Sequence, residues 1–258
     1  MKPLLILFLG LFWTATVYAD CAGEGLWIFP SGQTIKQNSM FVLTGYAESQ
    51  HVILGLNKKH AIYLKSGNKK IKLLVTEVCV GQFYVTQAVL KPETALETGL
   101  VYTMYIDNLP EYERFEKYNR ATKEYEPVRY TVVGGMDQEK PTLSDQPKEL
   151  KKTLVYYGCG PSIHVVFSNP AIDSSDVMVK TTVKNSKTGE ETTFYIEPEG
   201  NNIKVGHGMC SGAFVFDDSK HYEVEFSFMD ASGNLTAWTG DRIKFTKPTE
   251  RTDNYKDD

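Results

Sequence analysis

The stretch Tyr222-Glu223-Val224-Glu225-Phe226-Ser227-Phe228 decides the fold, because apolar and polar residues alternate strictly along it. Such alternation places apolar side chains on one face of a strand and polar side chains on the other. The stretch therefore predicts a strand with one buried and one solvated face. Short runs rich in aromatic and β-branched residues, bounded by Gly, Asn and Pro, recur along the chain. They predict an all-β protein.

The same pattern gives a set of expected strands in each half of the chain. In the first half we expect strands at 40–44, 51–54, 61–64, 70–75, 82–86, 101–106 and 129–133. In the second half we expect them at 153–157, 163–167, 177–183, 192–196, 213–216, 222–228 and 242–245. A polar stretch at 185–189 separates two of these runs, which is typical of a hairpin.

A polar segment lies between the two halves. Residues 136–150 contain Pro141 and Pro147 among charged and polar residues, with little apolar content. Domain boundaries fall in such segments. We therefore expect two tandem antiparallel β-sandwich domains, followed by a disordered tail. The expected limits are 20–135 for the first domain, 136–150 for the linker, 151–247 for the second domain and 248–258 for the tail.

Two stretches resemble a known class of domains. Tyr222 to Trp238, with Asp230-Ala231-Ser232-Gly233-Asn234 at the turn, resembles late hairpins of bacterial immunoglobulin-like and fibronectin type III-like domains. The first half, with Pro30 ahead of Phe41-Val42-Leu43, is loosely similar to the same class. The resemblance implies an immunoglobulin-like (Ig-like) fold. It supplies no catalytic residue, and it does not indicate a function, because proteins with this fold have many unrelated functions.

The N-terminus has the layout of a secretory signal peptide. A basic start precedes an apolar run at 4–13, and Ala19 is a small residue before the expected cut. We expect a signal peptide at 1–19 and a protein that is secreted, periplasmic or on the cell surface. A membrane anchor is less favoured, because the run is shorter than the about 20 residues of a span. A lipoprotein is less favoured, because Asp20 rather than a small residue precedes Cys21.

The chain contains four cysteines, and an even number in an exported protein predicts disulfides. Three pairings are compatible with four cysteines. Two lie before the expected linker and two after it. We therefore expect Cys21 to pair with Cys79, and Cys159 with Cys210.

Residues 110–127 differ from the rest of the chain in being dense in charge and tyrosine. Two acid–base pairs at i,i+4 spacing support a short helix, and a long ordered loop is the alternative. Tyrosine gives a large contact area with few torsions to freeze. The segment is therefore a candidate recognition loop, with Tyr112, Phe115, Tyr118 and Tyr125 as its aromatic residues. A loop that covers strands or joins domains is the alternative.

Two clusters have the residue types of metal sites. In His207-Gly208-Met209-Cys210, imidazole and soft sulfur ligands would suit copper, with His164 as a further ligand. We expect instead a structural turn, because glycines flank His207 and Cys210 should be oxidised. Asp230, Ser232 and Asn234 alternate as in calcium loops, but the sixth position lacks the glycine of such loops. We favour a hairpin turn in which Gly233 and Asn234 take positive φ.

Motifs for nucleophilic catalysis are missing from the sequence. There is no G-x-S-x-G motif, Ser162 and His164 have no evident orienting acid, and the cysteines should be oxidised. The net charge of −4 argues against a general nucleic-acid binder. We therefore expect a non-catalytic binding or structural protein without a cofactor, not membrane-spanning, whose partner is a protein or a glycan. The alternatives are a secreted hydrolase with a carboxylate pair, and a periplasmic metal-handling protein that uses His164, His207 and Met209.

Overall fold

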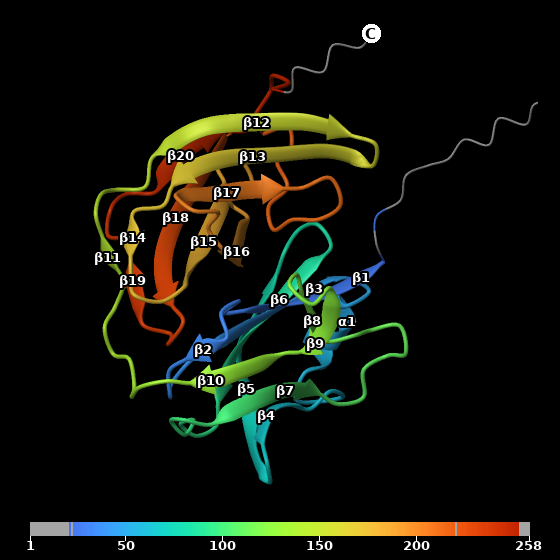
Figure 1. Ribbon diagram of the computed structural model, residues 1–258. Helices are drawn as coiled ribbons and strands as arrows, with labels where there is room; N and C mark the ends of the chain where they lie inside the picture. The colour runs from blue at the N-terminus through green and yellow to red at the C-terminus, as the bar shows by residue number, and fades with distance from the viewer. Residues whose placement is uncertain (1–20, 22, 220, 253–258) are drawn as a thin grey trace, which may run out of the picture.

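The computed structural model describes residues 21, 23–219 and 221–252, so the predicted signal peptide 1–19 lies outside the described residues. The protein is all-β and contains several sheets. Figure 1 shows two β-rich halves, with the N-terminal half in blue to green below the C-terminal half in yellow to red. Within the described residues, none of the helices has the length and hydrophobicity needed to cross a membrane.

One eight-stranded sheet dominates the N-terminal half. The elements of this half are β1 (Glu24–Phe29), β2 (Thr34–Ile35), β3 (Phe41–Ala47), α1 (Gln50–Gly55), β4 (Ile62–Ser66), β5 (Lys69–Val80), β6 (Val85–Pro92), β7 (Val101–Ile106), β8 (Glu116–Asn119), β9 (Glu124–Pro127) and β10 (Arg129–Val132). The strand order is β1-β3-β6-β5-β4-β7-β10-β2, and β8 and β9 form a separate hairpin. The long β5 links the two parts of the sheet, because its first residues pair with β4 and its last with β6.

The strands β2 and β10 run parallel, so the prediction of a purely antiparallel sandwich is wrong at this edge. Strand β1 lies at one edge of the sheet and β2 at the opposite edge. Only residues 30–33 separate these strands, so the two edges of the sheet lie close together in space, and the chain passes from one edge to the other through the cis peptide bond Phe29–Pro30. This crossing places the loop 30–33 beside residues that follow it by about a hundred positions in the chain.

The C-terminal half consists of two main sheets and a small one. Its strands are β11 (Thr142–Leu143), β12 (Glu149–Tyr157), β13 (Gly160–Ser168), β14 (Ala171–Ile172), β15 (Val177–Asn185), β16 (Glu191–Ile196), β17 (Asn202–His207), β18 (His221–Asp230), β19 (Leu235–Ala237) and β20 (Ile243–Thr246). The main sheets have the orders β12-β13-β17 and β16-β15-β18-β19, with β20 also paired to β18. The alternation in β18 is confirmed, since Tyr222, Val224, Phe226 and Phe228 are all buried.

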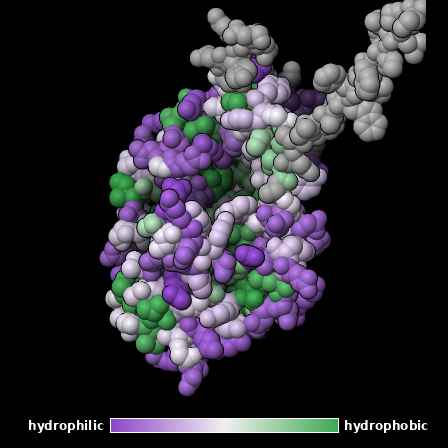
Figure 2. Space-filling model, turned by 45° about the vertical axis from the view of Figure 1, so that its right-hand side comes forward, coloured by the Kyte–Doolittle hydropathy of each residue, from purple (hydrophilic) through white to green (hydrophobic). Residues whose placement is uncertain are grey.

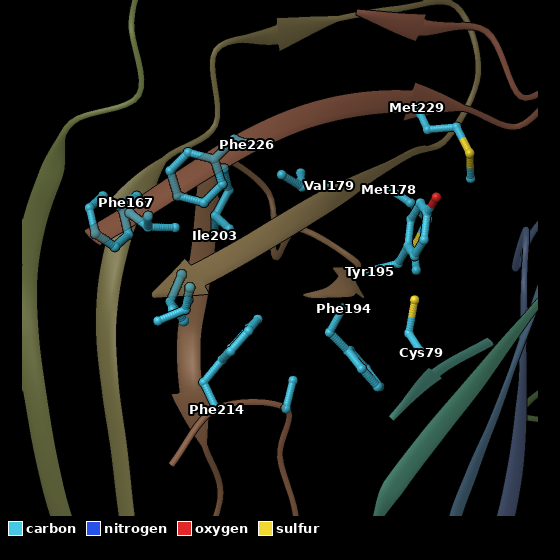
Figure 3. Close-up of a cluster of buried hydrophobic side chains, with 14 of the residues drawn as sticks. Cys79, Phe167, Met178, Val179, Phe194, Tyr195, Ile203, Phe214, Phe226 and Met229 are labelled. Atoms are coloured by element: carbon cyan, nitrogen blue, oxygen red, sulfur yellow. The ribbon is translucent and has the colours of Figure 1, made fainter. Parts of the chain in front are cut away.

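The hydrophobic core of the C-terminal half extends into the N-terminal half. Five buried residues of the first half belong to the same cluster as the aromatic residues of the second: Phe29, Val42, Cys79, Val85 and Val89. Figure 3 shows Cys79 beside Phe194 and Tyr195 at the boundary between the halves. A second cluster, which includes Phe41 and Tyr102, lies within the N-terminal half.

The face in Figure 2 is mostly hydrophilic, with small separate hydrophobic areas.

The segment 136–150, predicted as a linker, is hydrogen-bonded to both halves. The carbonyl of Asp137 accepts hydrogen bonds from the side-chain amides of Asn38 and Asn234, at 2.6 and 3.2 Å. Strand β11 within the segment pairs with β14. In the predicted tail, Thr252 exchanges backbone and hydroxyl hydrogen bonds with Leu154. Residues 253–258 of that tail lie outside the described residues.

Two of the predicted strands are wrong. Residues 51–54 belong to helix α1, which contacts β3 and β6. The glycine at position 45 allows this close approach, because a Cβ there would lie 2.5 Å from the carbonyl oxygen of Ser49. Residues 213–216 form no strand, although Phe214 and Phe216 are buried in the core. In both segments the apolar residues are buried without forming the backbone hydrogen bonds of a strand. A short apolar run therefore predicted a strand where there is none.

Candidate functional site

The tyrosine-rich segment forms a β-hairpin, so the predicted helix and the alternative loop are both wrong. Strands β8 and β9 pair directly, and the rings of Tyr118 and Tyr125 lie opposite each other with centroids 5.3 Å apart. The turn is built by Asn119, whose side-chain oxygen accepts a hydrogen bond from the backbone N–H of Ala121 at 2.9 Å. Lys123 completes the turn with φ +59°. The cross-strand aromatic pair stabilises the hairpin.

Three of the four predicted recognition residues are exposed, two on the hairpin and Tyr112 before it. Tyr112, Tyr118 and Tyr125 are 52%, 47% and 65% exposed. Phe115 instead packs in part against the core of the N-terminal half. Because Phe115 anchors the start of the hairpin, the exposed rings are held at a fixed place on the surface.

The hairpin covers a cavity of about 570 Å³, with the loop 30–33 and strand β10 as its other walls. Tyr130 lies at the base of this cavity and is 2% exposed. Its hydroxyl donates a hydrogen bond to the carbonyl of Pro30 at 3.0 Å. Burial raises the pKa of Tyr130 well above its ordinary value. This tyrosine therefore fixes the loop to the sheet rather than exchanging a proton.

Three basic side chains line the cavity: Lys117, Arg120 and Arg129. The ammonium of Lys117 donates a hydrogen bond to the carbonyl of Ser31, which joins the hairpin to the loop. Within the described part of the chain, Arg120 and Arg129 make no ion pair. The acid in the lining, Glu126, accepts hydrogen bonds from Asn119 and Thr122. The cavity therefore has an excess of positive charge in a chain that is negative overall.

The candidate metal ligands are only partly brought together. His164 and His207 lie on neighbouring strands and share the lining of a smaller cavity of about 240 Å³, which Met209 does not line. Burial, assisted by nearby positive charges, lowers the pKa of His164 to about 4. The Nδ1 atom of His207 is 2.8 Å from the carbonyl of Gly208, and its ring meets the ring of Phe83 edge-on. His207 therefore lies at the contact between the two halves.

Three carboxylates meet where the segment 136–150 joins the C-terminal half. Oxygens of Asp137, Asp173 and Asp230 all lie within 4.8 Å of one another. Asp230 is fully buried, and its Oδ1 accepts hydrogen bonds from the backbone N–H groups of Ser232 and Asn234, at 2.9 and 2.7 Å. Burial raises the pKa of Asp230 above its ordinary value. Asp137 and Asp173 are only half-buried, so the cluster combines one buried carboxyl with two that are partly exposed.

The turn that follows Asp230 is confirmed as a turn, with one correction. Gly233 has φ +84°, as predicted. Asn234 does not take positive φ, because it leads directly into strand β19 and its side chain bonds the Oδ2 atom of Asp230 at 2.7 Å.

The predicted disulfide pairing is wrong. The disulfide in the structure joins Cys21 to Cys210, with Cα atoms 5.8 Å apart, and so connects the two halves of the chain. Cys79 is a buried thiol in the shared core. Cys159 carries a thiol close to the disulfide. The prediction assumed that each disulfide lies within one half, whereas Cys21 lies beside the loop after β17.

Comparison with known proteins does not assign the chain to a family. No family model and no curated protein matches it. Similar solved structures include pullulanase type I from Bacillus subtilis str. 168 complexed with maltose, at TM-score 0.26 and 11% identity over 89% of this chain and 25% of that one. They also include the tandem Ig repeats of Dlar, at TM-score 0.23 and 10% identity over 87% and 96% of the two chains.

A third similar structure is the calcium binding domain CBD12 of CALX1.1, at TM-score 0.20 and 11% identity over 80% and 81% of the two chains. The chain spans about a quarter of the length of the pullulanase that it matches. Because all of these TM-scores are below 0.5, we infer neither fold nor function from them.

The sequence predicted one aromatic residue of the cavity, Tyr118, and did not predict Tyr130 or the basic residues as part of a site. Lys117 and Arg120 lie within the segment 110–127, where charge was attributed to a helix. Arg129 was assigned only to a strand. Its place in the cavity depends on the crossing of loop 30–33 to the β10 edge, for which the sequence carries no local signal.

Proposed function

We propose that this chain is an exported, non-catalytic binding protein with two Ig-like β-sandwich domains, and that it holds its ligand in the cavity beneath the β8–β9 hairpin. The observation that carries the proposal is the combination, at one place, of a concave shape, the exposed ring of Tyr118 and two guanidinium groups that form no ion pair with any described residue. Ligand cavities in proteins commonly occupy about 300–1,000 Å³ and combine aromatic walls with a few placed polar groups. The cavity of about 570 Å³ lies within this range.

The chemistry of the lining favours an acidic glycan as the ligand. The face of Tyr118 can pack against a sugar ring, because aromatic side chains offer a large apolar contact with little loss of entropy. The guanidinium groups of Arg120 and Arg129 can bind a carboxylate or sulfate through paired hydrogen bonds. The net charge of the protein opposes nonspecific binding of anions, so selectivity would come from this cavity alone.

A glycan array with uronic-acid, sialylated, sulfated and neutral members tests the proposal. We expect the full mature chain to bind acidic members, and Tyr118→Ala to weaken binding at least about fivefold, equivalent to ~1 kcal/mol. Arg129→Ala should abolish the preference for acidic over neutral glycans. Tyr157→Ala is the matched control, because Tyr157 is a comparably exposed tyrosine (55%) in the other half. Equal loss in the Tyr157 variant, or binding of no acidic glycan, contradicts the proposal.

A further inference from the structure

Three of the four cysteines form one cluster. The Sγ atoms of Cys21, Cys159 and Cys210 all lie within 4.8 Å of one another, and all three residues are half-buried. They come from three separate places in the chain. Cys21 lies three residues before β1, Cys159 lies in the turn between β12 and β13, and Cys210 lies in the loop after β17. A thiol therefore lies against a disulfide that connects the two halves.

The backbone of the turn that contains Cys159 packs against the loop that contains Cys210. Gly160 follows with φ +139°, a conformation that other residues rarely adopt. A Cβ at Gly160 would lie 3.6 Å from the carbonyl oxygen of Met209, the residue before Cys210. The β12–β13 turn and the loop after β17 are therefore packed together without the help of a covalent bond.

The fourth cysteine is excluded from this chemistry. Cys79 is 5% exposed and belongs to the apolar core between the halves. Burial, together with the charge of Glu77, raises the pKa of the Cys79 thiol to about 12. The thiolate is the nucleophile in disulfide exchange, so Cys79 should not take part in the exchange at neutral pH. Cys79 therefore serves as an internal control for a thiol that does not react.

We propose that Cys159 exchanges with the interdomain disulfide, so that the bond moves from Cys21–Cys210 to Cys159–Cys210. The thiolate of Cys159 attacks the Sγ atom of Cys210, the Cys159–Cys210 bond forms, and the Cys21–Cys210 bond breaks. The sulfur of Cys21 leaves as a thiolate and takes up the proton that Cys159 released. One disulfide and one thiol are present before and after, so no oxidant or reductant is needed.

The exchange changes what the disulfide connects. The bond Cys21–Cys210 spans 189 residues and ties the segment before β1 to the C-terminal half. The bond Cys159–Cys210 would join two points beside the sheet β12-β13-β17, within the C-terminal half. Cys21 would then lose its covalent bond to the C-terminal half and carry a thiol. The cluster is therefore a switch between a disulfide that joins the two halves and one that lies within the C-terminal half.

Peptide mapping of the oxidised mature protein tests this exchange. Trypsin places the four cysteines in four different peptides, so each pairing has its own mass. The protein is incubated at about pH 8.5, near the ordinary pKa of a cysteine thiol, then acidified, alkylated with N-ethylmaleimide and digested. We expect loss of about half of the Cys21–Cys210 peptide, with the Cys159–Cys210 peptide in its place, because exchange between similar bonds leaves both populated. The alkylated cysteine should change from Cys159 to Cys21 in step.

Three variants make the test decisive. Cys159→Ser should keep the Cys21–Cys210 bond through the same incubation, and Cys79→Ala should exchange like the unmodified protein. Cys21→Ser should oxidise to Cys159–Cys210, which tests the reach of these sulfurs even if exchange is slow. The proposal is overturned if the unmodified protein retains only Cys21–Cys210, if Cys159 and Cys210 both stay alkylatable in Cys21→Ser, or if pairs with Cys79 form as fast.

Discussion

One buried glutamine forms hydrogen bonds between the two halves, and its replacement gives a sharp test of the architecture. Gln87 on β6 is 3% exposed. Its Nε2 atom donates a hydrogen bond to the carbonyl of Tyr195 at 2.9 Å, and its Oε1 atom accepts one from the N–H of Tyr195 at 3.0 Å. The side-chain amide thus pairs with the outer edge of β16 as a neighbouring strand would.

Gln87→Leu keeps the approximate volume and removes both hydrogen bonds. Two buried backbone groups of Tyr195 then have no partner, and each such group costs about 1–3 kcal/mol. We therefore expect the free energy of unfolding to fall by roughly 2–6 kcal/mol, toward the lower end if water enters beside Tyr195. The amide of Gln87 also donates to Thr44 at 3.1 Å, but that hydroxyl is less buried and its loss adds little.

Guanidinium unfolding of the oxidised protein, followed by tryptophan fluorescence, measures this change. Gln146→Leu is the matched control, because Gln146 is exposed and its side chain makes no hydrogen bond in the described part of the chain. The control should change stability by less than about 0.5 kcal/mol. A similarly small effect of Gln87→Leu would refute the idea that these hydrogen bonds hold the halves together.

Two further predictions concern acid stability and the segment between the halves. Because burial lowers the pKa of His164 to about 4, the unfolded chain binds a proton that the folded chain does not, and stability should fall as the pH drops from 6.5 toward 4. His164→Asn should flatten this part of the curve in urea unfolding, whereas the exposed His51→Asn should leave its slope unchanged; equal slopes in both variants would contradict the assignment. Cleavage at a protease site inserted after Glu139 should leave the halves associated in gel filtration, even after reduction, because they share a hydrophobic core. Separation of the two fragments would show that this shared core contributes little.

The sequence predicted strand positions correctly where the burial of each residue depends on its neighbours in the same strand. The run 101–106 coincides with β7, and the alternating run 222–228 lies within β18, because the solvation of each residue follows from its neighbours in the same strand. The helix at 50–55 was missed, because a short apolar run has the same composition in a buried strand and in a short helix that covers a sheet. The strands of the β8–β9 hairpin were missed, because their polar residues show no buried face.

The relations between distant residues could not be predicted from the sequence. The pairing of Cys21 with Cys210 requires that the start of the chain lie beside the C-terminal half, and no property of either cysteine shows this. The cavity combines Pro30 with Arg129 only because β2, which follows β1 closely in the chain, pairs with β10 at the other edge of the sheet. Aromatic residues could be proposed as recognition residues from composition, whereas the charges around them depend on topology.

Strand β1 connects the two features that we propose, the disulfide cluster and the binding cavity. Cys21 lies just before β1, and the loop 30–33 that forms a cavity wall follows it directly. Between them, β1 pairs with β3 over six successive residues, and Phe29 at its end is buried in the shared core. Movement of the disulfide would therefore be absorbed by the residues before β1, since loosening the cavity wall requires breaking this ladder. Ligand binding and disulfide exchange are thus separable, and a failure of one proposal would leave the other intact.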